Sequence, residues 1–564
     1  MTAADRRVPP LAYGLLALLC LVLYLPGFFT LPPFDRDESR FAQASYQMLE
    51  SGDPVDIRFQ DEARHKKPVG IYWLQSAATA AANAALGTPG VKAIWTYRLP
   101  SLAGAVLSVL LTAWAGARLF GTAAGITAAV MLAGCVVLGV EARLAKTDAV
   151  LLATLVAAQG ALALAYRARA GGEDAAAPRW TWLLFWGAAG ISVLVKGPLV
   201  ALVSGGTAAG LVLADRVRDG RWSAGWLRAL RLKRGLLVLA AIVLPWLIAI
   251  AVQTKGAFFA ESVGHDMLGK VAGGQEGKGL PPGYYLLTFL ITFQPWAFLA
   301  LAAVPWVWAN RARPAVRFCL AWIIPTWLVF EAVPTKLLHY TLPVFPAVAL
   351  LAAAMLHDGV GRLRGRWPVI LALVLGGVGF AALTVAVAAL PWVIDRRINP
   401  AAVAVVPVAL VLFAGMVLWL FQGRQVQGLA AGLAAAAGLY AVAYGATLPS
   451  VDGLWVSRSA AALVAANRPC PGTVVAAAGY SEPSLVFLVG TSTRLVTGDK
   501  AAAHLAADPA CALALVESRQ EDALRTGLAG AGIAAARLQV LGTAEGLNYN
   551  NGRRMGLVLY RLEP

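Results

Sequence analysis

Long apolar runs recur from the start of the chain to about residue 450. A helix of about 20 apolar residues is long enough to cross the roughly 30 Å hydrocarbon core of a membrane. We count thirteen such runs, near residues 11–29, 96–117, 121–140, 149–166, 181–195, 198–214, 236–254, 284–308, 318–333, 340–357, 368–392, 401–421 and 428–448. The pattern predicts a polytopic α-helical membrane protein with about 13 transmembrane helices.

The composition supports this class and excludes others. Hydrophobic residues make up 59% of the chain and charged residues 14%, with a mean hydropathy of +0.67. A soluble globular protein has about 45–50% apolar and about 25% charged residues. A soluble enzyme, a disordered chain and a coiled coil are therefore all disfavoured.

The formal net charge of +17 would suggest a nucleic-acid partner in a soluble protein. Here the position of the basic residues gives another explanation. Arg6 and Arg7 precede the first run, and a dense basic segment lies at 216–234. Lys and Arg concentrate in the cytoplasmic loops of membrane proteins. We therefore predict a cytoplasmic N-terminus, a C-terminal segment outside, and no nucleic-acid partner.

Residues 450–564 have a different pattern from the apolar runs. Short β-rich runs near 472–478, 484–489, 512–516 and 556–562 alternate with helical patterns near 457–467 and 519–530. We predict a transmembrane catalytic domain over 1–449, with extracytoplasmic loops 30–95 and 255–283, and a small extracytoplasmic α/β domain over 450–564. Helical spacing within the first loop predicts amphipathic helices near 41–49 and 71–85.

Five cysteines are few for this length, and their spacing has no metal-binding signature. Cys20, Cys135 and Cys319 lie in apolar runs, where a buried thiol behaves as a small hydrophobe. Cys470 and Cys511 could form a disulfide if the C-terminal segment lies outside the cytosol.

The densest polar cluster, residues 35–40, directly follows the first apolar run. Acidic residues are favourable in the first turn of a helix, so Asp37 and Glu38 could simply form a solvated helix start. Alternatively, they are a carboxylate pair that acts as general base or ligand at the membrane face. Arg40 lies three residues after Asp37, on the same helix face, where it could orient the carboxylate or bind a phosphate.

Further ionisable residues lie at the outer ends of several apolar runs: Lys67, Arg143, Lys146, Asp148, Lys196, His265, Lys270, Lys336 and His339. Each one alone could be an anchor that reaches the membrane surface. Lys196 and Lys336 lie in very short turns between apolar runs, which favours a position facing the bundle interior. Several cations opposite carboxylates suit a lipid phosphate. His265 could be a phosphate donor, a metal ligand or a plain surface residue.

These residues carry a family resemblance. The ordered motifs are DRDESRFA (35–42), KKPVGIYW (66–73), Asp148, VLVKGP (193–198), His265 with GYYL (283–286), and TKLLHYTLPVFPAVAL (335–350). In this order they resemble the aminoarabinose lipid A transferase family. That family belongs to the C-fold glycosyltransferases, which use polyprenyl-phosphate sugars and are related to protein O-mannosyltransferases.

The resemblance implies roles for particular residues. Asp37 matches the family's essential carboxylate, with Glu38 as its neighbour. A phosphate and donor site would be lined by Arg40, Lys67, Lys196, His265, Lys270, Lys336 and Tyr340, and Asp148 would contact the acceptor or support the site from behind. Family members often have Glu before the Lys-Pro motif, where this chain has Lys66. That difference removes a candidate ligand for a divalent metal and leaves no cofactor assigned.

The resemblance also implies an activity. The expected enzyme is an inverting glycosyltransferase of the bacterial inner membrane, which moves an aminoarabinose-like or uronic-acid-like sugar from a polyprenyl phosphate to lipid A or another envelope glycolipid at the periplasmic face. A protein O-glycosyltransferase of the same fold is one alternative. A lipid-linked sugar transporter or flippase is another, although the sequence has no inverted repeat.

Overall fold

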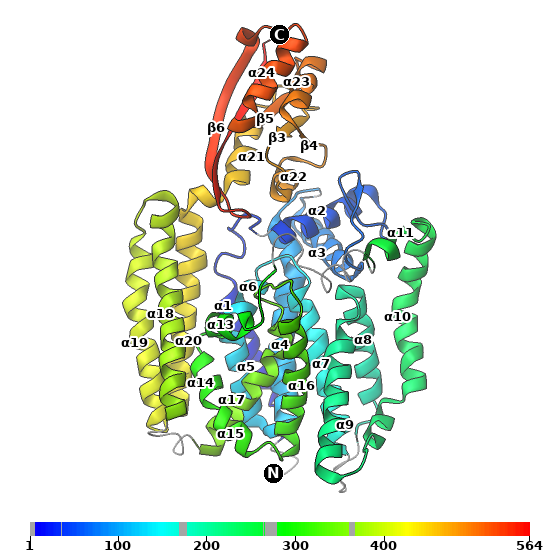
Figure 1. Cartoon of the computed structure of the whole chain (residues 1–564), viewed down its shortest axis with the longest axis vertical. Coiled ribbons are helices and arrows are strands. Elements are labelled where there is room, and N and C mark those ends of the chain that lie inside the picture. Colours follow the sequence, from blue (N-terminus) through cyan, green and yellow to red (C-terminus); the bar gives the residue numbers. More distant parts are fainter. Residues whose placement is uncertain are drawn as a thin grey trace.

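The computed structural model describes residues 6–34, 36–88, 90–168, 177–262, 264, 279–359 and 367–563. A bundle of roughly parallel helices forms most of the molecule, and a small α/β part stands at one end of it (Figure 1). The N-terminus lies at the opposite end of the bundle from this α/β part (Figure 1). The predicted fold class, a helical membrane protein with a small C-terminal α/β part, is confirmed.

Every predicted apolar run overlaps a helix or a series of helices. The bundle contains α1 (Pro10–Tyr24), α4 (Ile94–Phe120), α5 (Thr122–Gly134), α6 (Val136–Glu141), α7 (Asp148–Arg167), α8 (Thr181–Lys196), η3 (Ala201–Gly205), α9 (Gly206–Asp219), α10 (Leu232–Gln253), α16 (Pro314–Ala332), α17 (Phe345–Gly359), α18 (Trp367–Asp395), α19 (Pro400–Phe421) and α20 (Gln425–Val442). Seven helices among the described residues are long and apolar enough to cross a membrane. Thirteen crossings therefore remains a prediction.

Prolines divide some runs that the sequence pattern treats as single helices. Helix α1 ends at Tyr24, shortly before Pro26 and Gly27. The run at 284–308 is three helices: α13 (Tyr284–Thr292), α14 (Ala297–Ala302) and α15 (Val304–Ala309). Proline cannot donate a backbone hydrogen bond, so Pro295 interrupts this run, and Pro305 lies in the first turn of α15.

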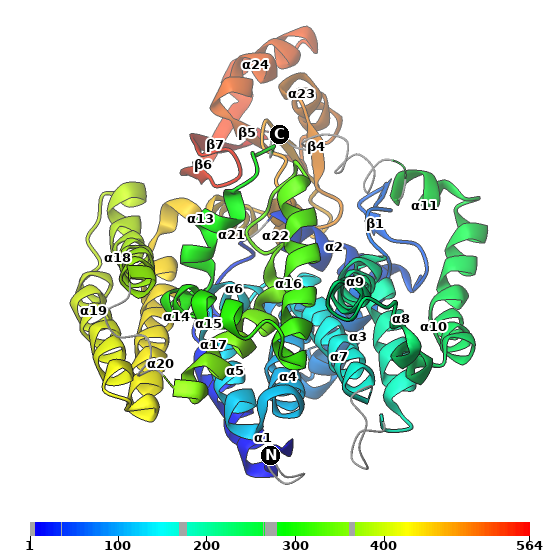
Figure 2. The same cartoon turned by 60° about the horizontal axis from the view of Figure 1, so that its bottom comes forward.

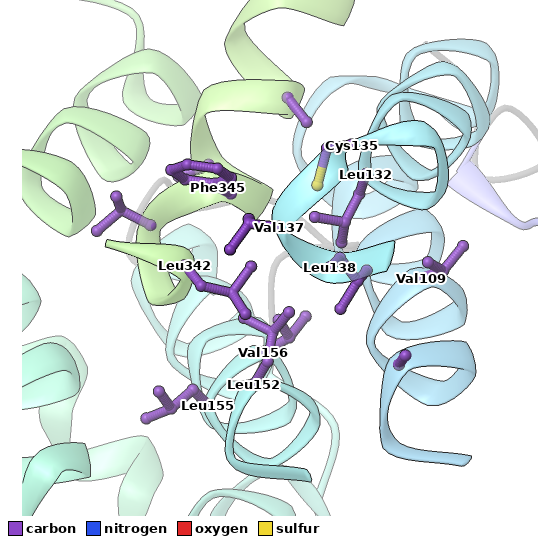
Figure 3. Close-up of a cluster of buried hydrophobic side chains, with 14 of the residues drawn as sticks. Val109, Leu132, Cys135, Val137, Leu138, Leu152, Leu155, Val156, Leu342 and Phe345 are labelled. Atoms are coloured by element: carbon purple, nitrogen blue, oxygen red, sulfur yellow. The ribbon is translucent and has the colours of Figure 1, made fainter. Parts of the chain in front are cut away.

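An apolar core fills the middle of the bundle. Side chains from α4, α5, α6, α7 and the start of α17 point toward one another there (Figure 3). Val137, Leu138 and Leu342 are at most 4% exposed. Helix α6 ends at Glu141, α7 begins at Asp148, and His339 lies just before Leu342. Three segments that carry ionisable groups therefore leave this core at one end of the bundle.

Two helices cover that end of the bundle (Figure 1). Helix α2 (Arg36–Ser51) and helix α3 (Gly70–Leu86) confirm the predicted helical patterns of the first loop. The start of α3 packs directly on the last turn of α8. A Cβ atom on Gly70 would lie only 2.8 Å from the carbonyl of Leu194. Only glycine permits this approach, which brings the segment after Lys67 against the helix end that carries Lys196.

The C-terminal part is a five-stranded mixed sheet with the strand order β4-β3-β5-β7-β6. Its strands are β3 (Val475–Ala478), β4 (Arg494–Val496), β5 (Leu513–Glu517), β6 (Leu538–Asn548) and β7 (Arg553–Leu562). Strands β4, β3 and β5 are parallel, and β7 pairs antiparallel with both β5 and β6. Its helices are α21 (Val456–Ala466), α22 (Pro483–Val489), α23 (Gly498–Ala507) and α24 (Glu521–Gly530). Separate hydrophobic clusters lie on the two faces of the sheet.

One predicted strand of this part is wrong. Residues 484–489 form α22, although the run of Val, Phe and Leu is typical of a buried strand. Pro483 at the first helical position favours a helix start, and the run is buried against neighbouring elements rather than hydrogen-bonded to a strand. Strands β4 and β6 and helix α23 were not predicted from the sequence.

Cys470 and Cys511 form a disulfide in this structure, across a sequence separation of 41 residues. Closing a loop of that size restricts the unfolded chain, and the typical stabilisation is about 2–4 kcal/mol. We expect Cys511→Ser to lower the thermal stability of the C-terminal part, measured by tryptophan fluorescence during heating. The same loss should follow in the wild type after reduction. An unchanged melting profile in both samples would contradict the prediction.

Candidate active site

Asp37 lies in the first turn of α2 and is the more accessible of the two predicted carboxylates. Its side chain is 43% exposed and forms an ion pair with Arg40, with 3.5 Å between Oδ1 and Nη1. The i,i+3 spacing places both groups on one helix face, as predicted. A carboxylate in this position can reach a solvent-side substrate while a guanidinium lies beside it.

Glu38, by contrast, is fully buried and serves as an anchor. Its carboxylate accepts hydrogen bonds from Arg98 Nε at 2.7 Å and from Arg98 Nη2 at 3.1 Å. It also accepts from the backbone N–H groups of Phe34 and Ala145, at 2.9 and 3.0 Å. Four donors therefore occupy its two oxygens. Glu38 fixes the start of α2 against the loop between α6 and α7, and this geometry favours a positioning role over direct catalysis.

Arg98 completes this anchor from helix α4. Its side chain is 1% exposed, and its Nη atoms donate to the carbonyls of Phe28, Leu31 and Pro32. The guanidinium thus joins α2, α4 and the segment after α1. Arg98 was not predicted as a functional residue, although an arginine inside an apolar run is a signal for one.

A second group of ionisable side chains lies at the same end of the bundle, and we call it the ionic cluster. It consists of Glu141, Lys146, Asp148, Lys196 and His339. Lys196 Nζ lies 2.5 Å from Asp148, and Lys146 Nζ lies 3.3 Å from Glu141. His339 lies between the two acids, 3.4 Å from Glu141 and 3.6 Å from Asp148. The ends of α6, α7 and α8 and the segment before α17 all contribute to this cluster.

The ionic cluster is buried and linked to the anchor. Every side chain in it is at most 17% exposed. Ala145, which donates to Glu38, directly precedes Lys146, so the start of α2 lies against the loop that carries the cluster. Glu141 and Asp148 lie on the helices α6 and α7, which also contribute side chains to the apolar core. Charges in such a low-dielectric site interact more strongly than they would in water.

Two further predicted residues lie at the same end of the bundle as the cluster. The ring centroid of Tyr340 is 5.6 Å from Lys196 Nζ, which brings these two predicted residues together. Lys67 is half-buried and lies three residues before Gly70, whose backbone touches the last turn of α8. The structure therefore positions Asp37, Arg40, Lys67, Asp148, Lys196 and Tyr340 at one end of the bundle.

Lys336, a predicted phosphate contact, binds backbone carbonyls in this structure. Its ammonium donates to the carbonyls of Phe330, Glu331 and Val333 at 2.8–3.1 Å, and its side chain has no exposed surface. These three bonds use all the donors of a lysine. Lys336 caps the end of α16, where carbonyls without helical partners favour a cation.

We expect Lys336→Met to lower stability rather than to weaken donor binding alone. Hydrogen bonds to a charged group are worth about 1.5–3 kcal/mol each, so the variant should lose at least about 2 kcal/mol. Thermal unfolding in detergent measures this loss. Unchanged stability together with weaker binding of a polyprenyl phosphate would restore the phosphate role.

His265 and Lys270 lie outside the described residues, as does Asp35. Within the described ranges, no group of three or more His, Cys, Asp or Glu side chains is arranged to hold a metal ion. His65, which the sequence analysis did not select, lies 2.9 Å from Asp56 and 3.5 Å from Glu261. These contacts join the first long loop to the segment after α10.

The C-terminal part rests on α2, beside Asp37. Arg36 lies 3.8 Å from Glu482, and Gln43 donates to Thr491 at 3.0 Å. Lys92 lies 3.7 Å from the ring centroid of Tyr46, and burial lowers the pKa of its ammonium to about 8. The helix that carries Asp37 is thus held between the bundle and the sheet.

The arrangement of the whole chain has close counterparts among solved structures. The crystal structure of ArnT from Cupriavidus metallidurans bound to undecaprenyl phosphate superposes with a TM-score of 0.73, covering 97% of both chains at 19% identity. The chain has the same fold as this ArnT structure. The apo oligosaccharyltransferase of Archaeoglobus fulgidus has a TM-score of 0.51 at 13% identity, covering 90% of this chain and 69% of that one. Both likenesses concern the fold.

Sequence comparison supports the ArnT-like resemblance. An undecaprenyl phosphate-alpha-4-amino-4-deoxy-L-arabinose arabinosyl transferase of Edwardsiella ictaluri is 28% identical over 402 residues, which is 67% of this chain and 65% of that protein. The protein of the same name from Pseudomonas paraeruginosa is 29% identical over 354 residues, 61% and 60% of the two chains. The chain thus spans about three fifths to two thirds of the length of these relatives. No family model matches it.

Proposed function

We propose that this chain is an inverting glycosyltransferase that moves a sugar from a polyprenyl phosphate to lipid A or another envelope glycolipid. One observation carries the proposal. The accessible carboxylate of Asp37 is held by the Glu38–Arg98 anchor beside a buried cluster that contains Lys146, Lys196 and His339. The names of the relatives, and the undecaprenyl phosphate bound to the ArnT structure, support the donor class.

The donor would bind with its phosphate at the cationic end of the bundle. Lys67, Arg40 and Lys196 would surround the phosphate, and Tyr340 would lie against Lys196. Asp148, at 2.5 Å from Lys196, would orient the ammonium group. The polyprenyl tail of the donor would remain among the apolar helices. The enzyme would therefore need no water-soluble nucleotide sugar.

In the reaction, an acceptor oxygen attacks the anomeric carbon while the bond from that carbon to the phosphate oxygen breaks. The electron pair of the broken bond stays on the lipid phosphate, whose charge the cations stabilise. A hydroxyl acceptor would transfer its proton to Asp37 as general base. An ionised lipid A phosphate needs no proton transfer, and Asp37 would then position the acceptor. A single displacement inverts the anomeric centre.

We further propose a bacterial inner-membrane location with the N-terminus in the cytoplasm. The basic segment at 216–234 lies at the end of the bundle away from α2, and cytoplasmic loops are rich in Lys and Arg. The site and the α/β part over 450–564 would then face the periplasm, together with the extracytoplasmic loops 30–95 and 255–283. The disulfide fits an oxidising compartment.

Lys196→Met is expected to reduce the rate of transfer by about 10²–10³-fold, the range for loss of one preorganised group that stabilises developing charge. Single-turnover assays with purified protein measure the effect. Lys66→Met is the matched control, because Lys66 is exposed in the Lys-Pro motif. Equal rates for the two variants would contradict the role of Lys196.

The direct test is transfer in vitro from defined polyprenyl-phosphate sugars to lipid A, followed by mass spectrometry. Release of free polyprenyl phosphate with a sugar gained by lipid A supports the proposal. Transfer to a protein acceptor would instead indicate a protein O-glycosyltransferase. Movement of the intact lipid-linked sugar between leaflets without bond cleavage would indicate a flippase.

A further inference from the structure

A charged cavity lies at the end of the bundle away from the candidate active site. It has a volume of about 420 Å³ and lies among the ends of α4, α7, α15, α16 and α17. Helices α15 and α16 and the N-terminus mark this region in Figures 1 and 2. Its lining residues are Arg6, Leu119, Phe120, Ala124, Arg167, Trp306, Arg313, Pro314, Ala315, Ala354, His357 and Asp358.

The charges around this cavity are mostly positive. Arg6, Arg167 and Arg313 line it, and Arg118 lies within electrostatic range of Arg167. Arg167 donates to the carbonyl oxygen of Arg118. Asp358 is the single acidic residue among the described lining residues, and it forms an ion pair with Arg313. Among the described residues, one carboxylate and three guanidinium groups therefore line the cavity, and the guanidinium of Arg118 lies nearby.

Buried donors near the cavity also lack partners. The Nε atoms of Arg6 and Arg118 are buried and have no hydrogen-bond acceptor among the described residues. A buried donor without an acceptor costs about 1–3 kcal/mol, and more when it is charged. An anion in the cavity would supply acceptors and offset the repulsion between these arginines.

The shape and lining of the cavity favour a lipid over a small soluble anion. Leu119, Phe120 and Ala354 provide an apolar wall next to the arginines. Arg313 lies 5.7 Å from the ring centroid of Trp306, and tryptophan is enriched at the membrane–water interface. The cavity is also much larger than an inorganic phosphate ion. Basic pockets between membrane helices on the cytoplasmic side suit anionic lipid headgroups.

We propose that this cavity binds the phosphate headgroup of an anionic membrane phospholipid. The guanidinium groups of Arg6, Arg167 and Arg313 would contact the phosphate, and the apolar wall would contact the glycerol and the first acyl carbons. Inorganic phosphate shares the charge but lacks the apolar part. This binding site is separate from the candidate active site and does not depend on the proposed transfer.

Binding can be measured by native mass spectrometry of the full chain, delipidated in detergent and titrated with cardiolipin. The Arg6→Gln/Arg313→Gln double variant should bind cardiolipin about 30-fold more weakly, because each basic residue contributes about fivefold. Asp358→Asn should bind about fivefold more tightly, since it removes the one carboxylate and frees Arg313. Misfolding cannot produce tighter binding. Arg228→Gln, an exposed arginine at the same end of the bundle, is the control.

Parallel titrations with phosphatidylcholine and with inorganic phosphate distinguish the source of the anion. Weak binding of both supports an anionic phospholipid. Competition by inorganic phosphate at a concentration equal to that of cardiolipin would assign the cavity to a soluble anion and overturn the proposal. Cardiolipin affinities that are the same in the wild type, the double variant and Asp358→Asn would also overturn it.

Discussion

Asp37→Asn is expected to abolish sugar transfer while leaving the protein folded. The substitution keeps the size of the side chain and removes both its negative charge and its ability to accept a proton. Because the Asp37 side chain is 43% exposed and forms an ion pair with Arg40 on its own helix, the fold should tolerate the change. General-base loss typically costs 10²–10⁴-fold in rate. Single-turnover transfer by purified protein measures it.

The control is Asp61→Asn, an exposed aspartate in the same loop. It should retain the wild-type rate, and both variants should give the wild-type elution volume in size-exclusion chromatography. Substantial turnover by folded Asp37→Asn protein would refute the catalytic role. A hydroxyl acceptor and a phosphate acceptor should also differ, because only the hydroxyl must lose its proton to a general base.

Arg98→Gln is expected to cause the largest loss of stability. Removing one partner of a buried ion pair leaves the other charge uncompensated, at a cost of about 3–5 kcal/mol. Glu38 would remain with no exposed surface and no counter-ion among its described hydrogen-bond donors. Thermal unfolding in detergent should show the loss, and transfer should fall because the start of α2 is no longer fixed.

A double-mutant cycle measures the interaction energy between Glu38 and Arg98 apart from their other contacts. Glu38→Gln alone should also destabilise, because it leaves the Arg98 guanidinium buried without a carboxylate. Glu38→Gln/Arg98→Gln should lose less than the sum of the two single variants. Additive losses would show that the two side chains act independently, in conflict with the 2.7 Å contact between them.

The membrane class of this chain could be predicted from the sequence because the bilayer imposes a length and a polarity on each helix. The thirteen apolar runs each overlap helical structure, and the ArnT-like fold is confirmed by a TM-score of 0.73. The pattern near 41–49 predicted the helix that the structure extends over 36–51 as α2, since amphipathic spacing is local. The local pattern at residues 484–489 wrongly predicted a strand. This segment is a helix, favoured by Pro483 at its first position and by the burial of the segment.

The candidate site was only partly predictable. Asp37 and Lys196 could be predicted as site residues because each is a charged residue next to an apolar run. Lys336 was predicted for the same reason, and the structure shows that this ammonium caps α16 instead. An adjacent pair such as Asp37 and Glu38 gives no local sign of which carboxylate is buried.

By itself, the sequence determined that this protein lies in a membrane, how many apolar runs it has and which helices begin near the site. These properties follow from composition and short-range spacing. Only the tertiary structure decided which ionisable residues contact one another and which of them are buried. Arg98 is 60 residues from Glu38, and His339 is nearly 200 residues from both Glu141 and Asp148. Contacts over such separations depend on how helices pack, which charge and spacing along the chain do not encode locally.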